Sequence, residues 1–600
     1  MKEMRLYTLW FTISLAQFFL IFHIWKVQIK KGDKYWNLSE GNRIKHIPLE
    51  APRGDIYDRN NKLLVKTRAS FDIFAIPKEL KRHPQSIKLL AKIMNVDIQN
   101  IWKKIRKRKR SPFVAQCFFK DISKKQMFII EENALQLPGI FLKVTPKRKY
   151  IHGKTAAHVL GYVGEVNNKD LKDLYVYGYS FGSLIGKMGI EKTYEPYLRG
   201  KKGGVQMEVN ALGQERHRLG HKPPEKGKDL ILTLDLDIQK IAEKKMAKHR
   251  GAVIVMNPKT SEVLAMVSQP SFDPNVFVEK SRLAELKKLL KNRKERPLLN
   301  RALGASFSPG SIFKIFVGLT GLKEKKITPA FKYTCSGSHR IGRLFHCWNK
   351  HGHGEVNLSK AIQTSCNVYF YKLSQTLPID TWVKYTKRFG FGKKTGIDLP
   401  HEKNGFVPDK MWKYRRFKEK WYRGETANFS IGQGYLLVTP LQLLTSVNIV
   451  INGGEWIQPY FVKTIKDGNK KSYDMEKPQK KNLNFSYKIL ESVRKGMKDV
   501  VNDPRGSGQR AFLKDIVVSG KTGTVELISR ERKKKFGSKL PKKYENHAWF
   551  SGYAPFDNPQ VSLIIFLENG KSGGRYAAKV AHDILKDIFE LPSYSQYKKV

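Results

Sequence analysis

Residues 308–317 read SPGSIFKIFV, a turn signal followed by an apolar run. Pro309-Gly310 predicts the turn, and the apolar residues after it predict the start of a buried helix. In such a helix Ser311 and Lys314 lie one turn apart on the same face. A serine hydroxyl becomes a good nucleophile when a nearby base takes its proton, and an unprotonated lysine can be that base. The helix N-terminus would also aim backbone N–H groups at negative charge developing beside Ser311.

Two further motifs give this Ser-x-x-Lys pattern its weight. Alone it is a weak signal, because the chain has 112 Lys plus Arg and the pattern recurs at residues 492–495 without a preceding turn. Residues 365–367, however, read SCN, and residues 521–524 read KTGT. The KTGT motif follows residues 516–520, IVVSG, a β-branched run that predicts a strand. This ordered set is typical of penicillin-binding proteins and class A β-lactamases.

Second copies of two motifs lie in less suitable settings. Residues 446–448 read SVN, but they continue the apolar helical run of residues 441–444 and are expected in the core. Residues 394–396 read KTG, but they follow the glycine-rich loop at residues 389–392. Because the third motif has to form one wall of the catalytic cleft, a strand is its expected setting. The preceding strand therefore favours Lys521 over Lys394.

Composition narrows the possible classes of protein. The chain has 600 residues, 40% of them apolar, which suggests more than one domain with sizeable cores. Its formal net charge is +59. Nucleic-acid binding is one interpretation of that charge. Lys and Arg are, however, spread over the whole chain and not gathered into one basic stripe, so we expect no nucleic-acid partner. A basic surface facing anionic lipid or an acidic polymer explains the charge as well. Four cysteines do not make a disulfide scaffold.

The N-terminal segment predicts a membrane span. Residues 6–25 carry no formal charge and are long enough to cross a bilayer. No small-residue cleavage site is visible before Lys26, so we expect an uncleaved single span. Charge alone would, if anything, put the large domain in the cytoplasm, because more lysines follow the span than precede it.

The remaining sequence predicts two globular parts. Residues 26–225 carry no catalytic constellation, and residues 221–228 have the composition of a linker. From Asp229 onward helices are expected at both ends and in the middle, with antiparallel strands between them. The predicted fold class is α+β, with an antiparallel sheet packed between helices in the C-terminal domain and a mixed α/β domain before it. The predicted segments are a cytoplasmic N-terminus at 1–5, a transmembrane helix at 6–25, a membrane-proximal pedestal domain, dimerisation-like, at 26–225 and a catalytic domain at 226–600.

With these motifs in order, the chain resembles the class B penicillin-binding proteins, and within them the elongation type, penicillin-binding protein 2. The resemblance covers nearly the whole chain, including the span, residues 53–60, residues 186–204, the three catalytic motifs and residues 424–434. It implies a peptidoglycan D,D-transpeptidase that cross-links stem peptides during cell elongation and is a target of β-lactams. Division-type relatives share most of these motifs, so a division-type transpeptidase is the alternative.

The resemblance also implies where the protein works and with what. Such proteins are anchored in the inner membrane with the catalytic domain in the periplasm, and this implication overrides the charge argument. No glycosyltransferase segment is evident, so strand polymerisation needs a partner. The resemblance implies a polytopic SEDS-family glycosyltransferase and other membrane proteins of the elongation complex.

For the nucleophile, the resemblance implies an acyl-enzyme mechanism. Ser311 attacks the carbonyl between the two terminal D-alanines of a stem peptide, and an amine of a neighbouring stem takes the acyl group. Lys314 is the base for Ser311. Its pKa must fall for it to be neutral near pH 7, and burial plus the nearby cation Lys521 would lower it.

For the substrate, the resemblance implies contacts from the other two motifs. Ser365 relays a proton to the leaving amine, and Asn367 holds the substrate amide. Thr522 and Thr524 bind the terminal carboxylate, and Lys521 attracts it. Gly523 leaves room for substrate against the strand. The backbone N–H groups of Ser311 and Thr524 form the oxyanion hole.

Two other classes of protein share part of this pattern. A β-lactamase needs a deacylating base and no membrane span, and a β-lactam sensor needs more spans and a cytoplasmic effector. Neither fits this chain. A catalytically dead scaffold that still binds β-lactams is the second rival, and the intact Ser311, Lys314 and Lys521 argue against it.

A cysteine cluster surrounds the second motif. Cys335, Cys347 and Cys366 fall within 32 residues, and His353 lies between them. Three thiolates and one imidazole can form a tetrahedral structural zinc site. A Cys335–Cys347 disulfide is an alternative, because an exported domain meets oxidants, and chance clustering is a third. A zinc ion would use all three thiols and would stabilise the loop of residues 365–367 without taking part in the reaction. For the reaction itself we expect no cofactor.

Overall fold

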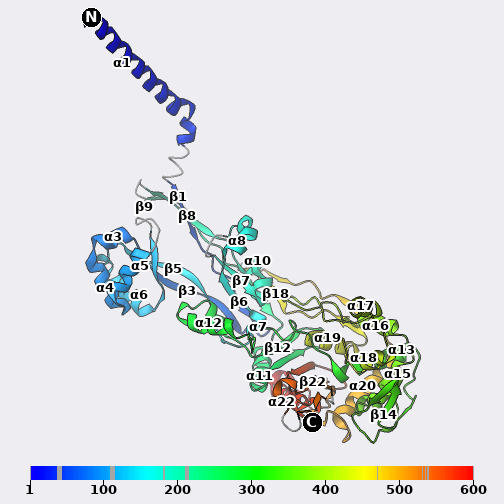
Figure 1. The fold of residues 1–600 in the computed structure, drawn as a ribbon. Helices are drawn as coiled ribbons and strands as arrows, with labels where there is room; N and C mark the ends of the chain where they lie inside the picture. The colour runs from blue at the N-terminus through cyan, green and yellow to red at the C-terminus, as the bar shows by residue number, and fades with distance from the viewer. Residues whose placement is uncertain are drawn as a thin grey trace. The chain divides into compact units, whose positions relative to one another are not determined.

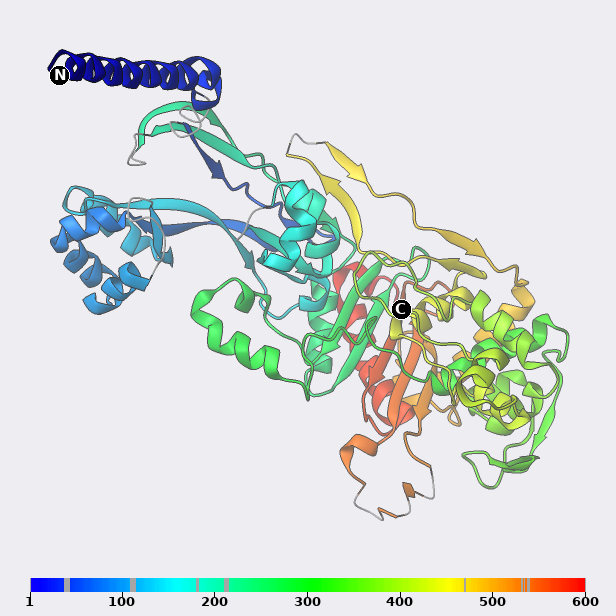
Figure 2. The same cartoon turned by 45° about the horizontal axis from the view of Figure 1, so that its top comes forward.

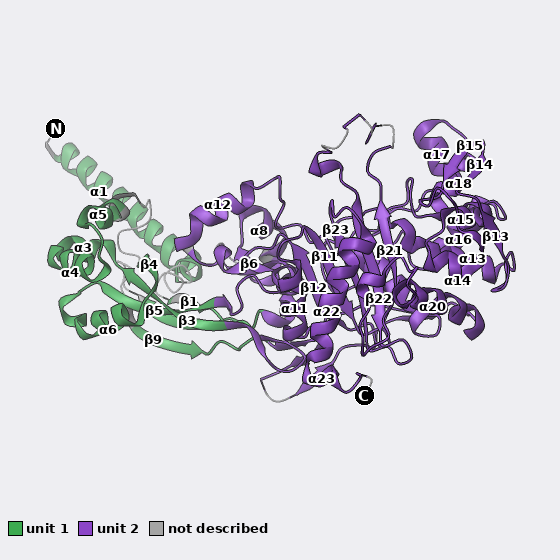
Figure 3. Cartoon of the chain, turned by 90° about the horizontal axis from the view of Figure 1, so that it is seen from below, with its two compact units in different colours: residues 1–54, 67–147, 199–227 green, residues 55–66, 148–198, 228–600 purple. Residues whose placement is uncertain are grey.

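The computed structural model describes residues 2–36, 44–107, 115–179, 183–209, 215–468, 471–529, 532–533, 535–536 and 540–598 (Figure 1). The chain forms two compact units (Figure 3). Unit 1 comprises residues 1–54, 67–147 and 199–227, and unit 2 comprises residues 55–66, 148–198 and 228–600. Two stretches of the expected membrane-proximal segment, residues 55–66 and 148–198, thus fold with the C-terminal part of the chain.

The predicted N-terminal helix is confirmed. Helix α1 (Lys2–Trp25) continues into a π-helical turn, Lys26–Lys30. The stretch Glu3–Lys30 has a mean hydropathy of 1.5 and is long and apolar enough to cross a membrane. Its exposed Leu, Phe, Ile and Trp side chains suit a lipid environment better than water.

Unit 1 combines a small sheet with a helical subdomain. Three antiparallel strands pair in the order β1-β8-β9. The helices surround a second, separate core that includes Ile73, Leu90, Ile101 and Phe118. The elements are β1 (Ile44–Leu49), β8 (Gly203–Val209), β9 (Glu215–Lys222), β3 (Leu63–Ala75), β4 (Gln116–Ile122), β5 (Ile140–Tyr150), α3 (Pro77–Arg82), α4 (Pro84–Met94), α5 (Ile98–Lys107) and α6 (Lys124–Glu132).

A five-stranded antiparallel sheet forms the centre of unit 2, in the order β12-β11-β23-β22-β21. All six residues of β11 are buried, which requires cover on both faces of the sheet. Helices α11 and α22 pack together against the strands, and α19 packs against β11 and β23 (Figure 2). The predicted α+β fold is confirmed. The elements are β11 (Gly251–Met256), β12 (Val263–Gln269), β21 (Ser519–Val525), β22 (His547–Ala554), β23 (Val561–Leu567), α11 (Leu236–Met246), α19 (Pro440–Ile451) and α22 (Ala578–Glu590).

A helical lobe beside this sheet holds most of the remaining helices of unit 2. These are α13 (Lys314–Lys323), α14 (Leu358–Gln363), α15 (Asn367–Ser374), α16 (Ile379–Arg388), α17 (Lys410–Phe417), α18 (Arg423–Ser430) and α20 (Tyr487–Asn502). Two short hairpins belong to the same part: β13 (Tyr333–Cys335) with β16 (Gly354–Val356), and β14 (Ser338–Ile341) with β15 (Arg343–His346). Helix α20 packs against α14 and against strand β21, so it links the lobe to the sheet.

Short peripheral elements complete unit 2. They are β2 (Ile56–Tyr57), β6 (Tyr162–Glu165), β7 (Leu184–Met188), β10 (Asp229–Leu232), β17 (Glu455–Ile457), β18 (Val462–Lys466), β19 (Ser472–Asp474), β20 (Lys480–Asn482), α7 (Ala157–Leu160), α8 (Asn168–Leu174), α9 (Gly189–Thr193), α10 (Glu195–Leu198), α12 (Leu283–Lys291) and α23 (Pro592–Ser595).

Asp58, just after β2, accepts the backbone N–H of Leu236 at the start of α11. The motif at residues 53–60 therefore supports the first helix of the sheet domain.

A buried ion pair joins the end of β5 to helix α9. The Nε atom of Arg148 lies 2.7 Å from Oε1 of Glu191, and the two side chains are 1% and 0% exposed. The hydroxyl of Tyr150 also reaches Oε1 of Glu191, at 3.4 Å. Both charges are buried away from water. The Arg148 guanidinium and the Glu191 carboxylate therefore stabilise each other in the core.

Removing the carboxylate tests this dependence. We expect Glu191→Ala to lower the free energy of unfolding of unit 2 by about 3–5 kcal/mol, because the Arg148 cation stays buried without its carboxylate. Denaturant unfolding followed by tryptophan fluorescence measures the loss. The joint Arg148→Met and Glu191→Leu replacement leaves no buried charge and should be the more stable of the two variants. An unchanged midpoint for Glu191→Ala would show that the pair does not stabilise the unit.

Candidate active site

The Ser-x-x-Lys motif lies on a tight turn at the start of α13. Residues Gly310–Phe313 form a 3₁₀ turn, and the α-helix begins at Lys314, three residues later than the sequence predicted. Such turns are common at helix starts because they use backbone N–H groups that lack intrahelical partners. Gly310 has φ +56°, and its N–H donates to the carbonyl of Gly432 at 2.9 Å. A Cβ on Gly432 would lie 2.2 Å from the Gly310 oxygen, so the two chains approach as closely as glycines allow.

The Ser-x-Asn motif forms the turn between α14 and α15. Ser365 has the left-handed conformation, with φ +55°, which ends α14 sharply. The turn brings three acceptors to the buried Nζ of Lys314: the carbonyl oxygen of Ser365 at 2.8 Å, its hydroxyl at 3.3 Å and Oδ1 of Asn367 at 2.7 Å. The second motif therefore surrounds the amine of the first.

The Lys-Thr-Gly-Thr motif lies on β21, an edge strand of the five-stranded sheet, as predicted. A Cβ on Gly523 would lie 3.1 Å from the carbonyl oxygen of Pro309, so this glycine lets the strand close on the nucleophile turn. The other expected role of Gly523, to leave room for substrate against the strand, stays a prediction. Thr524 Oγ1 accepts the N–H of Gly573 at 3.1 Å, which leaves its own hydrogen free to donate to a ligand.

Burial sets the charge state of the two lysines. It lowers the pKa of Lys314 to about 8. Burial also lowers the pKa of Lys521 well below its usual value, and the nearby charge of Lys314 lowers it further. Burial is thus the main cause of the lowered pKa of Lys314. The repulsion between the two lysines, which the sequence predicted would lower the pKa of Lys314, lowers the pKa of Lys521 instead. Two ammonium groups so placed disfavour each other, and the favoured arrangement is one neutral amine beside one cation.

Ser507 is a residue of this site that sequence reasoning missed. Its backbone N–H donates to the carbonyl of Gln363 at 3.2 Å, and its hydroxyl lies 3.0 Å from that of Thr522. It therefore connects the loop of the second motif with the strand of the third. The signal in the sequence was a Gly506-Ser507-Gly508 turn between an amphipathic helix and a predicted strand. A Cβ on Gly506 would lie 2.3 Å from the Val500 oxygen, which explains the glycine there.

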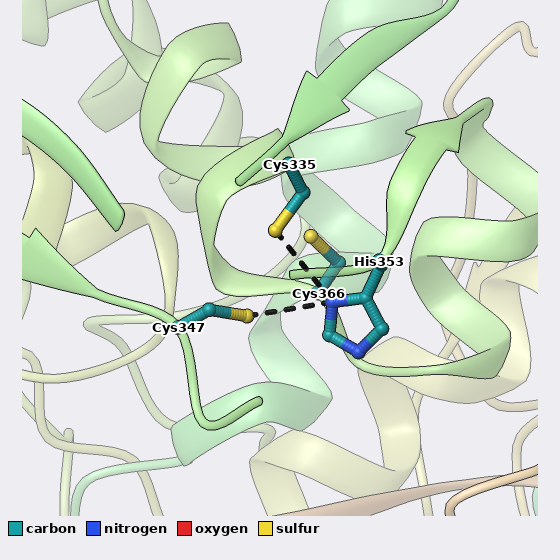
Figure 4. Close-up of side chains that lie close together, drawn as sticks. All are labelled: Cys335, Cys347, His353 and Cys366. Atoms are coloured by element: carbon teal, nitrogen blue, oxygen red, sulfur yellow. Dashed lines mark hydrogen bonds between the residues drawn. The ribbon is translucent and has the colours of Figure 1, made fainter. Parts of the chain in front are cut away.

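The three cysteines and the histidine meet as a cluster behind the second motif (Figure 4). Their ligand atoms all lie within 4.8 Å of one another. Nδ1 of His353 is 3.6 Å from Sγ of both Cys335 and Cys347. Hydrogen bonding from the Cys366 thiol, together with His353, lowers the pKa of Cys347 and of Cys335. Thiolates are the form in which cysteine binds metals, so this donor set fits a tetrahedral zinc ion.

The cluster is tied to the catalytic loop through two contacts. The N–H of Asn367 points at Sγ of Cys347, 3.4 Å away. The indole N–H of Trp348 donates to the carbonyl of Thr364 at 2.9 Å, and its ring lies against that of His353. A shift of the thiols would therefore also shift the loop that carries Ser365 and Asn367.

The second copies of the motifs have ordinary structural roles. The hydroxyl of Ser446 donates to carbonyl oxygens of Phe389 and Gln442 inside the buried helix α19. Thr395 bonds Glu402 through its backbone N–H and its hydroxyl. Ser492 lies in α20, where its hydroxyl donates to the Lys488 carbonyl. These three serine and threonine side chains are thus engaged in local structure.

Comparisons with known proteins agree with this geometry. Residues 251–590 match the penicillin binding protein transpeptidase domain, and residues 48–232 match the penicillin-binding protein dimerisation domain. The chain is 34% identical to the peptidoglycan D,D-transpeptidase MrdA of Haemophilus influenzae, over 96% of this chain and 90% of that protein.

Solved structures agree as well. The chain is similar to penicillin-binding protein 2 of Helicobacter pylori in complex with MreC, with a TM-score of 0.79 and 32% identity over 92% of this chain and 99% of that one. It is also similar to a chain from a peptidoglycan synthase complex that coordinates polymerization and crosslinking, with a TM-score of 0.73 and 28% identity over 98% of both chains. The chain therefore belongs to the penicillin-binding protein transpeptidases, in the penicillin-binding protein 2 group of peptidoglycan D,D-transpeptidases.

Proposed function

We propose that this chain cross-links peptidoglycan stem peptides during lateral elongation of the wall, through an acyl-enzyme at Ser311. The observation that carries the assignment of residues is the convergence of three motifs. The amine of Lys314 contacts Ser365 and Asn367, while strand β21 closes on the turn that holds Ser311. The names of the relatives favour elongation over the division-type alternative.

The reaction begins with the removal of the Ser311 proton. Neutral Lys314 takes it, and Oγ of Ser311 forms a bond to the carbonyl carbon between the two terminal D-alanines. The ammonium that forms on Lys314 has three hydrogens, which matches the three acceptors around its Nζ. Ser365 Oγ, 3.3 Å from that Nζ, passes a proton to the leaving D-alanine amine. An amine of a neighbouring stem then attacks the acyl-enzyme, and Ser311 regains its proton.

The third motif binds the charged end of the substrate. The hydroxyls of Thr522 and Thr524 donate to the terminal carboxylate, which Lys521 attracts in its protonated form. The backbone N–H groups of Ser311 and Thr524 stabilise the oxyanion, and losing one such donor typically reduces the rate by about 10²–10³. Asn367 holds the substrate amide. These steps use side chains and backbone groups of the chain alone.

The setting of the reaction follows from the apolar helix and from the relatives. Helix α1 anchors the chain in the inner membrane as a single span, with the catalytic domain in the periplasm. A polytopic SEDS-family glycosyltransferase supplies the strands, and other membrane proteins of the elongation complex assemble with it. Support comes from two similar structures, one a complex with MreC and the other from a peptidoglycan synthase complex.

We also propose that the cysteine and histidine cluster holds a structural zinc ion. The ligands are Sγ of Cys335, Cys347 and Cys366 and Nδ1 of His353, and the support is the approach of these four atoms to within 4.8 Å of one another. Zinc in such a closed site contributes to folding and leaves no position for substrate. Its effect on the reaction is to fix the loop that carries Ser365 and Asn367.

Replacing the nucleophile gives the first test. Ser311→Ala should abolish covalent labelling by a fluorescent penicillin, because the acyl group is carried by the Ser311 oxygen, whereas the Ser365 hydroxyl beside Lys314 only relays a proton. Labelling is read on a denaturing gel, and circular dichroism checks that the fold is retained. The matched control is Ser492→Ala, which alters the chance Ser-x-x-Lys pattern and should label normally. Residual labelling of Ser311→Ala, or an adduct mapped to Ser492, contradicts the assignment.

Ser507 should act through Thr522. We expect Ser507→Ala to slow acylation by a penicillin with a free carboxylate by about tenfold, because the Thr522 hydroxyl, which donates to Ser507 Oγ at 3.0 Å, loses the neighbour that fixes its position. The methyl ester of the same penicillin lacks that carboxylate, so its acylation rate should change much less. Ser507→Thr keeps the hydroxyl and should restore the preference for the acid. Equal losses for acid and ester would mean that Ser507 only supports the fold.

Zinc content tests the metal site. Purified full-length protein should contain about one zinc per chain by elemental mass spectrometry, as four ligands around one ion require. Cys366→Ser and His353→Ala should lower both the zinc content and the rate of penicillin acylation, since the loop loses its support. Cys117→Ser, at the cysteine outside the cluster, is the control and should change neither. Metal-free protein with a Cys335–Cys347 crosslink in peptide mapping rules the site out.

A further inference from the structure

Helix α17 has an inverted pattern of burial. Its buried residue is Lys413, whose side chain is 2% exposed. Three of its large apolar residues, Met411, Tyr414 and Phe417, are 59%, 58% and 42% exposed. A surface helix normally buries its apolar residues and exposes its charges. A concentration of exposed aromatic side chains on a soluble domain marks a surface that binds something.

The buried lysine explains how the helix is held. The ammonium of Lys413 pairs with Glu425 and, at 3.4 Å, with Glu419, and it lies 4.3 Å from the centre of the Tyr422 ring. Glu425 also accepts the N–H of Tyr422 at the start of α18. Helix α17 is thus fixed to its neighbour α18 through charge (Figure 1). Its aromatic side chains are therefore not needed to hold it in place.

Four rings form a connected surface, which we call the aromatic platform: Phe406, Trp412, Phe417 and Tyr435. Trp412 lies 4.8 Å from Phe406, 4.9 Å from Tyr435 and 5.6 Å from Phe417 between ring centres. Phe417 and Tyr435 are also 5.6 Å apart, and they are 42% and 40% exposed. Rings that support one another in this way are held rigidly, so a ligand that stacks on them loses little freedom in the protein.

The platform borders the nucleophile turn. Tyr435 follows Gly432 by three residues, and the Gly432 carbonyl accepts the N–H of Gly310, next to Ser311. Further along the same segment, Leu437 pairs with Phe406 of the platform through two backbone hydrogen bonds. The segment of residues 432–438 therefore joins the platform to the catalytic serine.

Cations are frequent in the segment that carries Trp412 and Phe417. Residues 410–420 read KMWKYRRFKEK, six cations against one acid. Arg415, Arg416 and Lys420 are exposed, and the structure gives none of these three described residues a carboxylate partner within 4 Å. Exposed cations beside stacked rings suit a ligand that has flat apolar faces and carboxylates.

We propose that the aromatic platform binds the glycan strand whose stem peptide is attached to Ser311. The apolar C–H faces of the sugar rings stack on Phe417 and Tyr435, and Arg416 pairs with carboxylates of the stems along the strand. This inference rests on the proposed function, because the stem peptide at Ser311 is a branch of such a strand. Adjacency to the nucleophile and charge complementarity favour this polymer over a protein partner.

Binding of defined strands tests the proposal on the full-length protein in detergent. The probe is uncross-linked glycan strands with pentapeptide stems, compared with the same strands after removal of the stems and with the free pentapeptide. Phe417→Leu keeps apolar bulk but removes the ring face, and should weaken binding of both kinds of strand about tenfold. Binding of the free pentapeptide and acylation by penicillin should stay within about twofold of the wild type.

Three further variants keep the test sharp. Phe417→Tyr retains the ring and should bind strands normally, while Arg416→Gln should weaken only strands that carry stems. Tyr414→Ala is the control, because Tyr414 is an even more exposed ring on α17 that lies outside the platform, and it should bind strands normally. Wild-type affinity of Phe417→Leu for strands overturns the proposal and assigns the platform to a protein partner, and equal losses in Phe417→Leu and Phe417→Tyr overturn it as well. Failure of the wild type to be acylated by penicillin would instead refute the proposed function.

Discussion

The burial of the Lys314 amine is the constraint on which the rest of the site depends. A lysine ammonium in an apolar interior is costly unless each hydrogen finds an acceptor. Here the acceptors come from a single turn, which Ser365 can form only by adopting a left-handed backbone conformation. The same burial that lowers the pKa of the base therefore dictates the shape of the loop beside it. Strand β21 then adds Lys521, a second buried amine whose pKa is lowered by burial and by the charge of Lys314, so the two amines are not protonated together.

Much of this arrangement could be predicted from the sequence, because the motifs carry their own structural signals. A turn dipeptide preceded Ser311, and a β-branched run preceded Lys521, and each signal placed its motif on the correct kind of element. The apolar N-terminal helix was equally clear from its length and composition. The cysteine spacing also brought the right four residues together, although spacing alone did not distinguish a metal from a disulfide.

The features that sequence reasoning missed depend on contacts between residues distant along the chain. Ser507 has a common residue type on a short turn, and only its two hydrogen bonds reveal that it joins two motifs. Residues 148–198 precede the linker, yet they fold with unit 2 through contacts such as the hydrogen bond from Tyr194 to Asp398. Helix α17 depends on such contacts too, because the lysine at its buried position pairs with two glutamates that follow the helix.

The three glycines around the nucleophile turn limit how such an enzyme can evolve under antibiotic selection. A side chain at Gly432 would meet the Gly310 oxygen, one at Gly523 would crowd the Pro309 oxygen, and Gly310 itself needs a backbone conformation that other residues rarely adopt. A side chain at Gly432 or Gly310 would distort the turn, and Gly523 leaves little space for one. Resistance by point mutation is therefore directed to surrounding loops, where a change alters the fit of an inhibitor without unfolding the turn. A drug that draws most of its affinity from the glycine-lined turn leaves such a population fewer routes of escape.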